Sequence, residues 1–230
     1  MKKIVVFTGA GVSADSGIST FRDADGLWEN YRIEDVCTAE AIVRNRDLVI
    51  DFYNNLRKQL LSKEPNAAHY ALAELAKYFD VRVITQNVDD LHERAGSQNV
   101  LHLHGELRKL RSSYDETAAI PIEGWEQDKQ ARHPDGSLLR PFIVFFGEGV
   151  PNFSEACQIA STADICLVIG TSFNVYPAAS LLQYVPESAK IYVVDPGEPN
   201  FGSYINRVTW IKERAAIGVP PLCKELIEKA

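Results

Sequence analysis

The sequence lacks the features that mark membrane proteins and nucleic-acid-binding proteins. No apolar run approaches the roughly 18 residues of a spanning helix. Lys and Arg number 24 against 31 Asp and Glu, a formal net charge of −7. No block of like charge stands out, so a general electrostatic grip on phosphate backbones is disfavoured. With 46% hydrophobic and 24% charged residues among 230, the composition is that of one globular domain rather than of a disordered or fibrous chain.

Cysteine is scarce and unpaired in its spacing. The four positions are Cys37, Cys157, Cys166 and Cys223. Two of them stand in apolar runs, which indicates buried thiols in a reducing compartment, so we expect a cytoplasmic protein. The start of the chain imitates a signal peptide through Lys2-Lys3 and a short apolar stretch, but Thr8 and Gly9 end that stretch too early.

Short β-branched runs alternate with helical patterns along the chain. The runs predicted to be buried strands are 2–8, 81–85, 99–104, 141–146, 165–170, 190–195 and 207–211. Apolar residues recur at spacings of three and four, typical of helices, in 47–61, 66–79, 154–163 and 219–229. The alternation predicts an α/β fold with a Rossmann-like, mostly parallel sheet and helices on both faces.

Two polar segments interrupt this rhythm. Residues 22–62 contain no strand pattern, and residues 106–139 are polar and irregular. We expect them to form a small lobe inserted in a single domain spanning 1–230. A cleft between lobe and sheet would lie at the carboxyl ends of the strands, where open α/β sheets bind ligands.

A glycine-rich turn follows the first predicted strand. The segment GAGVSA (9–14) fits the G-x-G-x-x-G/A fingerprint, which allows a tight turn and a close approach of pyrophosphate to the backbone at a helix start. A turn without any ligand would use the same residues, so both interpretations stay open. The second predicted strand ends in Gln86-Asn87 instead of the acidic residue of a dehydrogenase. Dinucleotide binding without ordinary hydride transfer is therefore the better hypothesis.

Other reaction templates are missing. No Gly-Lys follows the glycine turn, no Tyr has a Lys four residues later, and no G-x-S-x-G elbow occurs. Polar residues remain at the ends of buried strands, where they would point into the mouth of the cleft. These groups are 85–89, His104-Gly105, 170–172 and Asp195.

Five stretches together resemble one family. They read GAGVSADSGISTFRDADGLW (9–28), TQNVDDLHERAG (85–96), LHGE (103–106), RPFIVFFGE (140–148) and GTSFNVYPAA (170–179). In these the sequence is similar to the sirtuins, NAD-dependent protein-lysine deacylases, in family order over nearly the whole chain. FRDADGLW, EDVCT and FYNN resemble most the short bacterial branch related to the mitochondrial desuccinylase. The resemblance implies NAD as cofactor, acyl-lysine peptides or proteins as partners, and nicotinamide and O-acyl-ADP-ribose as products.

The resemblance also implies where NAD binds. The diphosphate and nicotinamide ribose would be held by Gly9, Ala10, Gly11, Ser13, Asp15, Phe21 and Arg22. Ile18, Asn87 and Asp89 would form the nicotinamide pocket, and Gln86 would bond the ribose. The adenosine side would be reached by Gly170, Thr171, Ser172 and Asp195. The family usually has Asn at the last position, which puts that ribose contact in doubt.

His104 is implied to be the general base, with Gln86 and Asn87 as its catalytic neighbours. In the sirtuin scheme the acyl-lysine oxygen attacks the ribose carbon as nicotinamide leaves, and the histidine then activates a ribose hydroxyl. An ordinary imidazole pKa of about 6.5 leaves much of the side chain neutral near pH 7. Without the resemblance, a histidine at a strand end would be read as a structural residue. His102 stands two residues earlier, but further metal ligands at a recognisable spacing are missing, so no metal is expected.

The substrate residues follow in the same way. The peptide would add as a strand between two edges made by Phe146, Gly147, Glu148, Asn174, Val175 and Tyr176. The acyl pocket would contain Cys37, Tyr53 and Leu56. The desuccinylase branch has an Arg at the last position to grip an acidic acyl group, whereas Arg57 here is rotated by about 100° on a helix. Neutral acyl groups, acetyl or longer, are therefore favoured, while acidic ones stay open.

The small lobe departs from the family as well. Most sirtuins hold a structural zinc there with two cysteine pairs, but 106–139 has no cysteine, and Ser112-Ser113 and Pro134-Asp135-Gly136 stand near the expected places. We therefore predict no zinc, and a lobe that relies on packing. The residues expected to provide that packing are Tyr114, Ile120, Ile122 and Trp125.

Two other functions remain as alternatives. The same fold could carry out ADP-ribosyl transfer or NAD hydrolysis, although His104 argues for deacylation. A binding module that responds to NAD without releasing nicotinamide is the other. We expect a monomer that binds neither nucleic acid nor membranes.

Overall fold

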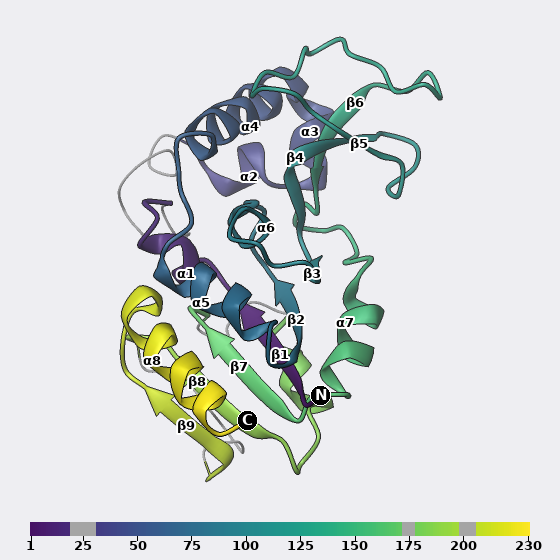
Figure 1. Cartoon of the computed structure of the whole chain (residues 1–230). Helices are drawn as coiled ribbons and strands as arrows, with labels where there is room; N and C mark the ends of the chain where they lie inside the picture. Colours follow the sequence, from purple (N-terminus) through teal and green to yellow (C-terminus); the bar gives the residue numbers. More distant parts are fainter. Residues whose placement is uncertain (19–30, 172–177, 198–205) are drawn as a thin grey trace.

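A six-stranded, fully parallel sheet forms the larger part of the molecule (Figure 1). The computed structural model describes residues 1–18, 31–171, 178–197 and 206–230. The strand order is β3-β2-β1-β7-β8-β9. The strands are β1 (Lys3–Thr8), β2 (Asp80–Thr85), β3 (Val100–His102), β7 (Ile165–Ile169), β8 (Lys190–Val194) and β9 (Val208–Ile211).

Both faces of this sheet are covered. The helices α5 (Ala67–Leu75) and α8 (Ala215–Glu228) lie on one face, and α7 (Phe153–Ala160) and the 3-10 helix η2 (Ala178–Tyr184) lie on the other (Figure 1). Alternate residues of β1 serve the two cores: Ile4 and Val6 pack with α5 and α8, and Val5 packs with α7 and η2. Because both faces of the sheet are buried, the sequence of β1 is a continuous apolar run rather than an alternation of apolar and polar residues.

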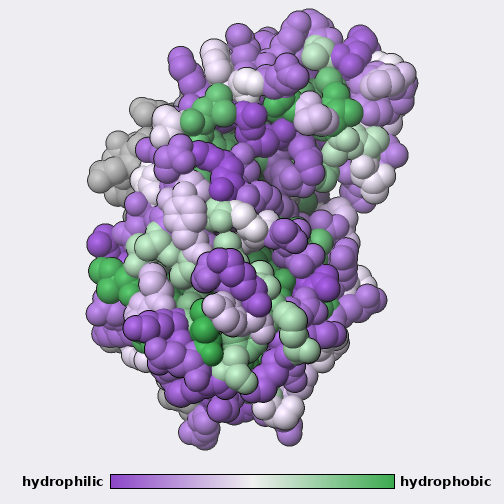
Figure 2. All heavy atoms as spheres, viewed as in Figure 1, coloured by the Kyte–Doolittle hydropathy of each residue, from purple (hydrophilic) through white to green (hydrophobic). Residues whose placement is uncertain are grey.

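The small lobe lies beyond the carboxyl ends of the parallel strands (Figure 1). It combines three helices with a three-stranded antiparallel sheet of order β5-β4-β6. The elements are α2 (Ile33–Val36), α3 (Ala39–Arg44), α4 (Arg46–Leu60), β4 (Gly105–Ser112), β5 (Ala119–Pro121) and β6 (Leu139–Ile143). The space-filling view shows the surface drawn in where this lobe meets the sheet (Figure 2).

Helix α5 begins where the sequence predicts, after Pro65-Asn66. The Asn66 side chain accepts from the amide of Ala68 at 2.9 Å, and His69 Nδ1 accepts from the Asn66 amide at 3.2 Å. This reciprocal capping satisfies donors that the first turn cannot pair internally.

Two expectations about the elements are wrong. The run 141–146 is not a strand of the parallel sheet: β6 ends at Ile143 and pairs antiparallel with β4 in the small lobe. The segment 106–139, expected to be irregular, contributes to β4, β5 and β6. A short buried apolar run has no periodicity that distinguishes parallel from antiparallel pairing, so tertiary contacts decide. Helix α8 also starts at Ala215, ahead of the expected 219.

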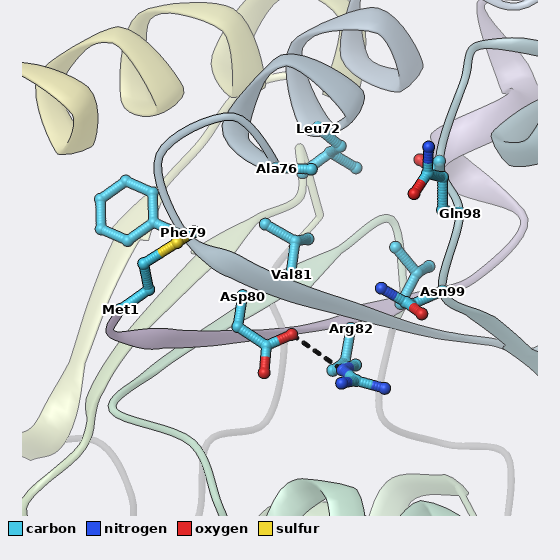
Figure 3. A pocket seen from close by; sticks show the side chains of 11 residues that line it. Met1, Leu72, Ala76, Phe79, Asp80, Val81, Arg82, Gln98 and Asn99 are labelled. Carbon is cyan, nitrogen blue, oxygen red and sulfur yellow. Dashed lines mark hydrogen bonds and ion pairs between the residues drawn. The ribbon is translucent and has the colours of Figure 1, made fainter.

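A cavity of about 350 Å³ opens at the other end of the sheet, beside the amino-terminal half of β2 (Figure 3). β3 pairs only with Val83–Thr85, so on that side the earlier residues of β2 border this cavity, while on their other side they pair with β1. Within it Arg82 Nε lies 2.9 Å from Asp80 Oδ1. Among the described residues no helix is long and apolar enough to cross a membrane.

Candidate active site

Three glycines bring the turn after β1 against the turn after β7. A Cβ on Gly11 would lie 2.6 Å from the Cα of Gly170, and a Cβ on Gly170, whose φ is +61°, would lie 2.4 Å from the Val12 nitrogen. The amides of Gly9 and Gly11 donate to the carbonyls of Ile169 and Gly170, both at 3.0 Å. The close contact between the two loops is therefore enough to require these glycines, even without a ligand. The fingerprint did not predict this role.

The turn offers fewer free amides than a long helix start would. Helix α1 (Gly11–Ala14) has four residues, and the amides of Val12 and Ser13 donate to the Gly9 and Ala10 carbonyls. Within residues 9–13, only the Ala10 amide has no partner among the described residues. Beside the turn, Gln86 Oε1 accepts from Thr171 Oγ1 at 3.3 Å. The described part of the turn thus offers an anion one free amide, with Gln86 and Thr171 nearby.

Ser13, Asn87 and Asp89 form a buried hydrogen-bonded group. Ser13 Oγ donates to Asp89 Oδ2 at 2.9 Å and accepts from Asn87 Nδ2 at 3.1 Å. Burial raises the pKa of Asp89, and bonds from the Leu91 amide and from Ser13 oppose that rise. The Ile18 amide points back to the Ser13 carbonyl at 3.4 Å. The structure thus joins Asn87 and Asp89, predicted for the nicotinamide pocket, to Ser13, which was predicted for the diphosphate and its ribose.

His104 follows β3 and is half-buried at the joint between sheet and lobe. Its Nδ1 lies 3.0 Å from the Gln86 carbonyl, which can only accept, so Nδ1 carries the proton and Nε2 keeps its lone pair. Burial lowers the pKa of His104, partly opposed by this bond. Gly105, with φ +88°, holds the backbone so close to Phe142 that a Cβ would lie 2.1 Å from its carbonyl oxygen. The arrangement leaves a neutral imidazole whose Nε2 lone pair is able to accept a proton.

Asp15 and Asp195 have local partners of their own. Asp15 Oδ1 lies 2.9 Å from Arg214 Nη1, and its Oδ2 accepts from the Ala216 amide at 3.3 Å, so this carboxylate ties α1 to the start of α8. Asp195, directly after β8, accepts from the Gly197 amide at 2.8 Å. The sequence contained no signal for the pairing of Asp15 with α8.

Cys37, Tyr53 and Leu56 meet in the apolar cluster of the small lobe. The Tyr53 hydroxyl donates to Cys37 Sγ at 3.6 Å, and burial raises the pKa of the Cys37 thiol to about 11. Arg57 is fully buried and donates elsewhere. Its acceptors are the Leu107 carbonyl at 2.7 Å, the Trp125 carbonyl at 2.6 Å and Asn54 Oδ1 at 2.8 Å.

The segment after β6 is fastened at two points. The Phe146 amide donates to the Cys37 carbonyl at 2.9 Å and its carbonyl accepts from the Ala39 amide at 3.1 Å, while the Phe146 side chain stays 55% exposed. Gly147 turns the chain with a φ of +91°.

Glu148 anchors the other end of this segment. Arg140 binds both of its oxygens, Nη1 at 2.7 Å and Nη2 at 3.1 Å, while Arg111 Nη2 lies at 3.3 Å and the Phe145 amide at 2.9 Å. Its carboxylate is therefore engaged in holding the loop, a structural contact that the sequence did not indicate.

A protein-family model described as the Sir2 family matches residues 9–177. The chain belongs to the Sir2 family. A curated relative from Aggregatibacter actinomycetemcomitans is 55% identical over 203 residues, covering 88% of this chain and 97% of that protein. One from Helicobacter pylori strain 26695 is 48% identical over 232 residues and covers 100% of both. Both carry the name NAD-dependent protein deacylase.

Solved Sir2 structures share the fold. A crystal structure of a Sir2 homolog–NAD complex has a TM-score of 0.89 and 38% identity, over 99% of this chain and 90% of that one. A Sir2 structure with a deacetylated p53 peptide and 3′-O-acetyl ADP ribose has a TM-score of 0.75 and 30% identity, over 99% and 93% of the two chains. The parallel sheet with a small antiparallel lobe is thus the Sir2 fold.

This Sir2 protein has hydrogen-bonding side chains near the places where the resemblance puts the zinc cysteines of most sirtuins. Ser112 Oγ donates to Asp135 Oδ2 at 2.5 Å, lies 2.9 Å from Ser137 Oγ and accepts from the Tyr114 amide at 2.9 Å. Across the described ranges no group of three or more His, Cys, Asp or Glu is arranged to hold a metal. Packing through Tyr114 was a wrong expectation, since this side chain is 82% exposed, whereas Ile120, Ile122 and Trp125 are half-buried.

Some residues predicted for the site of this Sir2 protein are not described by the structure, and one residue of the site, Thr85, was not predicted individually. The positions that lie outside the described residues are Phe21, Arg22, Ser172, Asn174, Val175 and Tyr176. Thr85 was named only as part of a polar group, yet its Oγ1 accepts from the Asn87 amide at 3.0 Å and from Thr8 Oγ1 at 2.8 Å. Its place at the end of a buried strand was the available signal.

Proposed function

We infer that this chain removes acyl groups from lysine side chains of proteins and consumes NAD in doing so. The curated relatives named NAD-dependent protein deacylase match it over most of their length, and their name supports deacylation over ADP-ribosyl transfer. The observation that carries the catalytic assignment is the neutral imidazole of His104, whose Nδ1 is held by the Gln86 carbonyl while Nε2 is left to accept a proton.

The residues around the glycine turn fit NAD. A side chain at Gly9 would meet the Gly170 carbonyl, Thr171 and Gln86 within 3.1 Å, so backbone lines this cradle, and the Ala10 amide is available to a phosphate oxygen. When bound, NAD supplies an electrophilic ribose carbon with nicotinamide as its leaving group. We assign the diphosphate and its ribose to residues 9–13, with Gln86, and the adenosine to Gly170, Thr171 and Asp195.

The buried amide and carboxylate of the site suit a carboxamide. Asn87 and Asp89 provide donors and acceptors, and Ser13 orients both through its hydroxyl. We assign Ile18 to the apolar wall beside them. We assign the nicotinamide to this pocket, where polar side chains already held in place lose little freedom on binding.

We propose that the acyl pocket prefers neutral groups. Leu56 stands where an acidic acyl group would need a cation, and Arg57 is committed to carbonyls of the small lobe. A carboxylate desolvated there would lack a charge-assisted partner. Rates on matched acetyl-, butyryl- and succinyl-lysine peptides test this, and a faster succinyl reaction would reverse the assignment.

The function is tested by replacing His104 with Ala and following peptide and nucleotide products by mass spectrometry. Deacylation should be lost while NAD still binds, and the matched control His133→Ala, outside the site, should stay active. Nicotinamide release from the wild type with intact peptides would indicate transferase or hydrolase chemistry instead. Since the pKa of His104 lies below 6.5, kcat/KM should fall only in acid below that pH.

We further propose that the chain acts as one catalytic domain, 1–230 with lobe insertions at about 22–62 and 106–139, and as a cytoplasmic monomer. All four cysteines are free, in keeping with a reducing compartment. The net charge of −7 offers no general affinity for nucleic acid. Light scattering on the purified protein tests the monomer.

A further inference from the structure

His102 lies at the end of β3, two residues before His104, and is 6% exposed. Its Nδ1 is 2.9 Å from the Asn87 carbonyl oxygen. Its Nε2 is 2.8 Å from Oε1 of Glu93, on helix α6 (Leu91–Arg94). Each ring nitrogen therefore faces an oxygen.

Neither of these oxygens can donate a proton. A backbone carbonyl accepts only, and so does an ionised carboxylate. Both ring nitrogens of His102 must then carry hydrogen, which makes this side chain an imidazolium. His92 differs: its Nε2 lies 3.0 Å from Thr8 Oγ1, and its Nδ1 has no partner in the described part of the chain.

His102, the last residue of β3, and His104, which follows the strand, bond adjacent backbone carbonyls of one loop. His104 Nδ1 donates to Gln86 and His102 Nδ1 donates to Asn87. On its other side the Asn87 amide donates to Thr85 Oγ1 at 3.0 Å. The backbone of Asn87 is thus hydrogen-bonded through both its amide and its carbonyl. These two bonds fix the position from which its side chain bonds Ser13.

The charges around His102 favour its protonated form. Burial alone lowers the pKa of His102, but the bond and charge of Glu93, the Asn87 carbonyl and the charge of Glu106 together raise it above its ordinary value. Its charge acts in turn on Asp89, where it opposes the rise in pKa due to burial, and on His92, whose pKa it lowers further.

We propose that His102 is a positioning residue: as a buried imidazolium paired with Glu93, it fixes the Asn87 carbonyl and so orients Asn87 and the neighbouring Gln86–His104 contact. The inference rests on the proposed roles of Asn87 and His104 in deacylation. It assigns the two imidazoles opposite states near neutral pH, one charged for support and one neutral for proton transfer.

NMR of the isotope-labelled histidine nitrogens tests the charge without using activity. At about pH 7 one buried histidine should show two protonated ring nitrogens, and its signal should vanish in His102→Asn. Glu93→Gln removes the carboxylate at a partly exposed position and should return His102 to a neutral ring. A neutral His102 in the wild type would overturn the proposal, whether or not the protein deacylates lysine.

Kinetics with NAD as the varied substrate test the positioning. His102→Leu removes the donor and should lower kcat/KM by about tenfold to a hundredfold, the loss of one charged hydrogen bond. His102→Asn places an amide donor near the position of Nδ1 and should regain most of that loss. The exposed control Glu225→Gln should match the wild type. Equal losses in the Leu and Asn variants, or no loss in either, would overturn the role.

The two proposals fail separately. If His104→Ala stays active, the catalytic assignment is wrong, and the NMR result still decides the state of His102. If His104→Ala is inactive while His102→Leu matches the wild type, deacylation stands and the positioning role is wrong.

Discussion

The parallel sheet and the small lobe are held together by different interactions. In the sheet, Ile4, Val6 and Leu167 are fully buried between helices, and apolar contacts dominate. In the lobe, an apolar cluster is joined by buried hydrogen bonds from Arg57 and Asn54. Apolar burial is proportional to area and has no direction, whereas each hydrogen bond requires a particular geometry. The lobe thus obtains its shape from directional contacts that a small apolar core could not specify.

Arg57 is the centre of those contacts. It joins α4 to β4 and to the loop at Trp125, and Asn54 extends the network to the Gln127 amide at 2.8 Å and the Gln127 carbonyl at 3.1 Å. Burial, together with the charge of Arg108, lowers the pKa of Arg57 to about 10. The guanidinium stays charged near neutral pH, and its hydrogen bonds connect segments that are distant in sequence.

The largest effect should come from a cavity in the sheet. Leu167→Ala in β7 removes a fully buried side chain and should cost about 3 to 5 kcal/mol of unfolding free energy, because the packed sheet cannot collapse into the space. Urea denaturation measures it. The exposed lobe variant Val43→Ala should cost less than about 0.5 kcal/mol. A loss below about 1 kcal/mol for Leu167→Ala would contradict a rigid apolar sheet.

Acid should weaken the sheet next. Burial lowers the pKa of His69, in the first turn of α5 and in contact with His92 of α6, from 6.5 to about 4. Between pH 6.5 and pH 4 the unfolded chain therefore binds a proton at His69 and the folded chain does not. The free energy of unfolding should fall by about 3 kcal/mol as the pH is lowered through this range.

The variant His69→Gln isolates this effect. Glutamine at this position can still bond the Asn66 amide as in a capping box but does not titrate. Its unfolding free energy should fall less between pH 7 and pH 4 than that of the wild type. Parallel pH profiles of the two proteins would exclude His69 as the cause.

A smaller loss is expected when the lobe loses its directional contacts. Arg57→Met keeps the length of the side chain but leaves the Leu107 and Trp125 carbonyls unpaired, at a cost of about 2 kcal/mol. Hydrogen exchange should quicken in β4 and leave β1 and β7 unchanged. The exposed Gln59→Met on the same helix serves as control. Faster exchange in the sheet as well would show that the two regions unfold together.

The smallest effect should be that of metal removal. The Ser112–Asp135 contact lies in the region where most sirtuins hold a structural zinc. No set of thiolates is there to bind the ion, so chelators should change neither Tm nor deacylation. Elemental analysis checks this directly. One zinc per chain would contradict it.

The sheet could be predicted from the sequence better than the lobe. Strands buried on both faces, such as 165–170, appear as apolar runs that need no knowledge of their partners. The run 141–146 looks the same but belongs to the lobe, because pairing partners are chosen by contacts distant in sequence. The lobe's polar network has no periodic signature at all.

The site was predictable in its members but not in all their contacts. Asn87 and Asp89 were expected in one pocket, and both bond Ser13, which was expected at the diphosphate and its ribose. Asp15 was expected near the cofactor, yet it bonds the Ala216 amide 201 residues away. Such carboxylate pairings depend on where separate elements end in space. The catalytic and binding roles themselves stay predictions until the variants are measured.

The position of β1 in the middle of the sheet bears on how the molecule is made. A ribosome delivers β1 first, yet the Lys3 amide bonds the Asp164 carboxylate, 161 residues later, and Gly9 and Gly11 complete their turn only against Ile169 and Gly170. The nascent chain must therefore keep an apolar strand without its second neighbour until β7 has been synthesised. A chain that stops before β7 lacks the carbonyls that bond the Gly9 and Gly11 amides, so this turn is completed only after residue 170 has been synthesised.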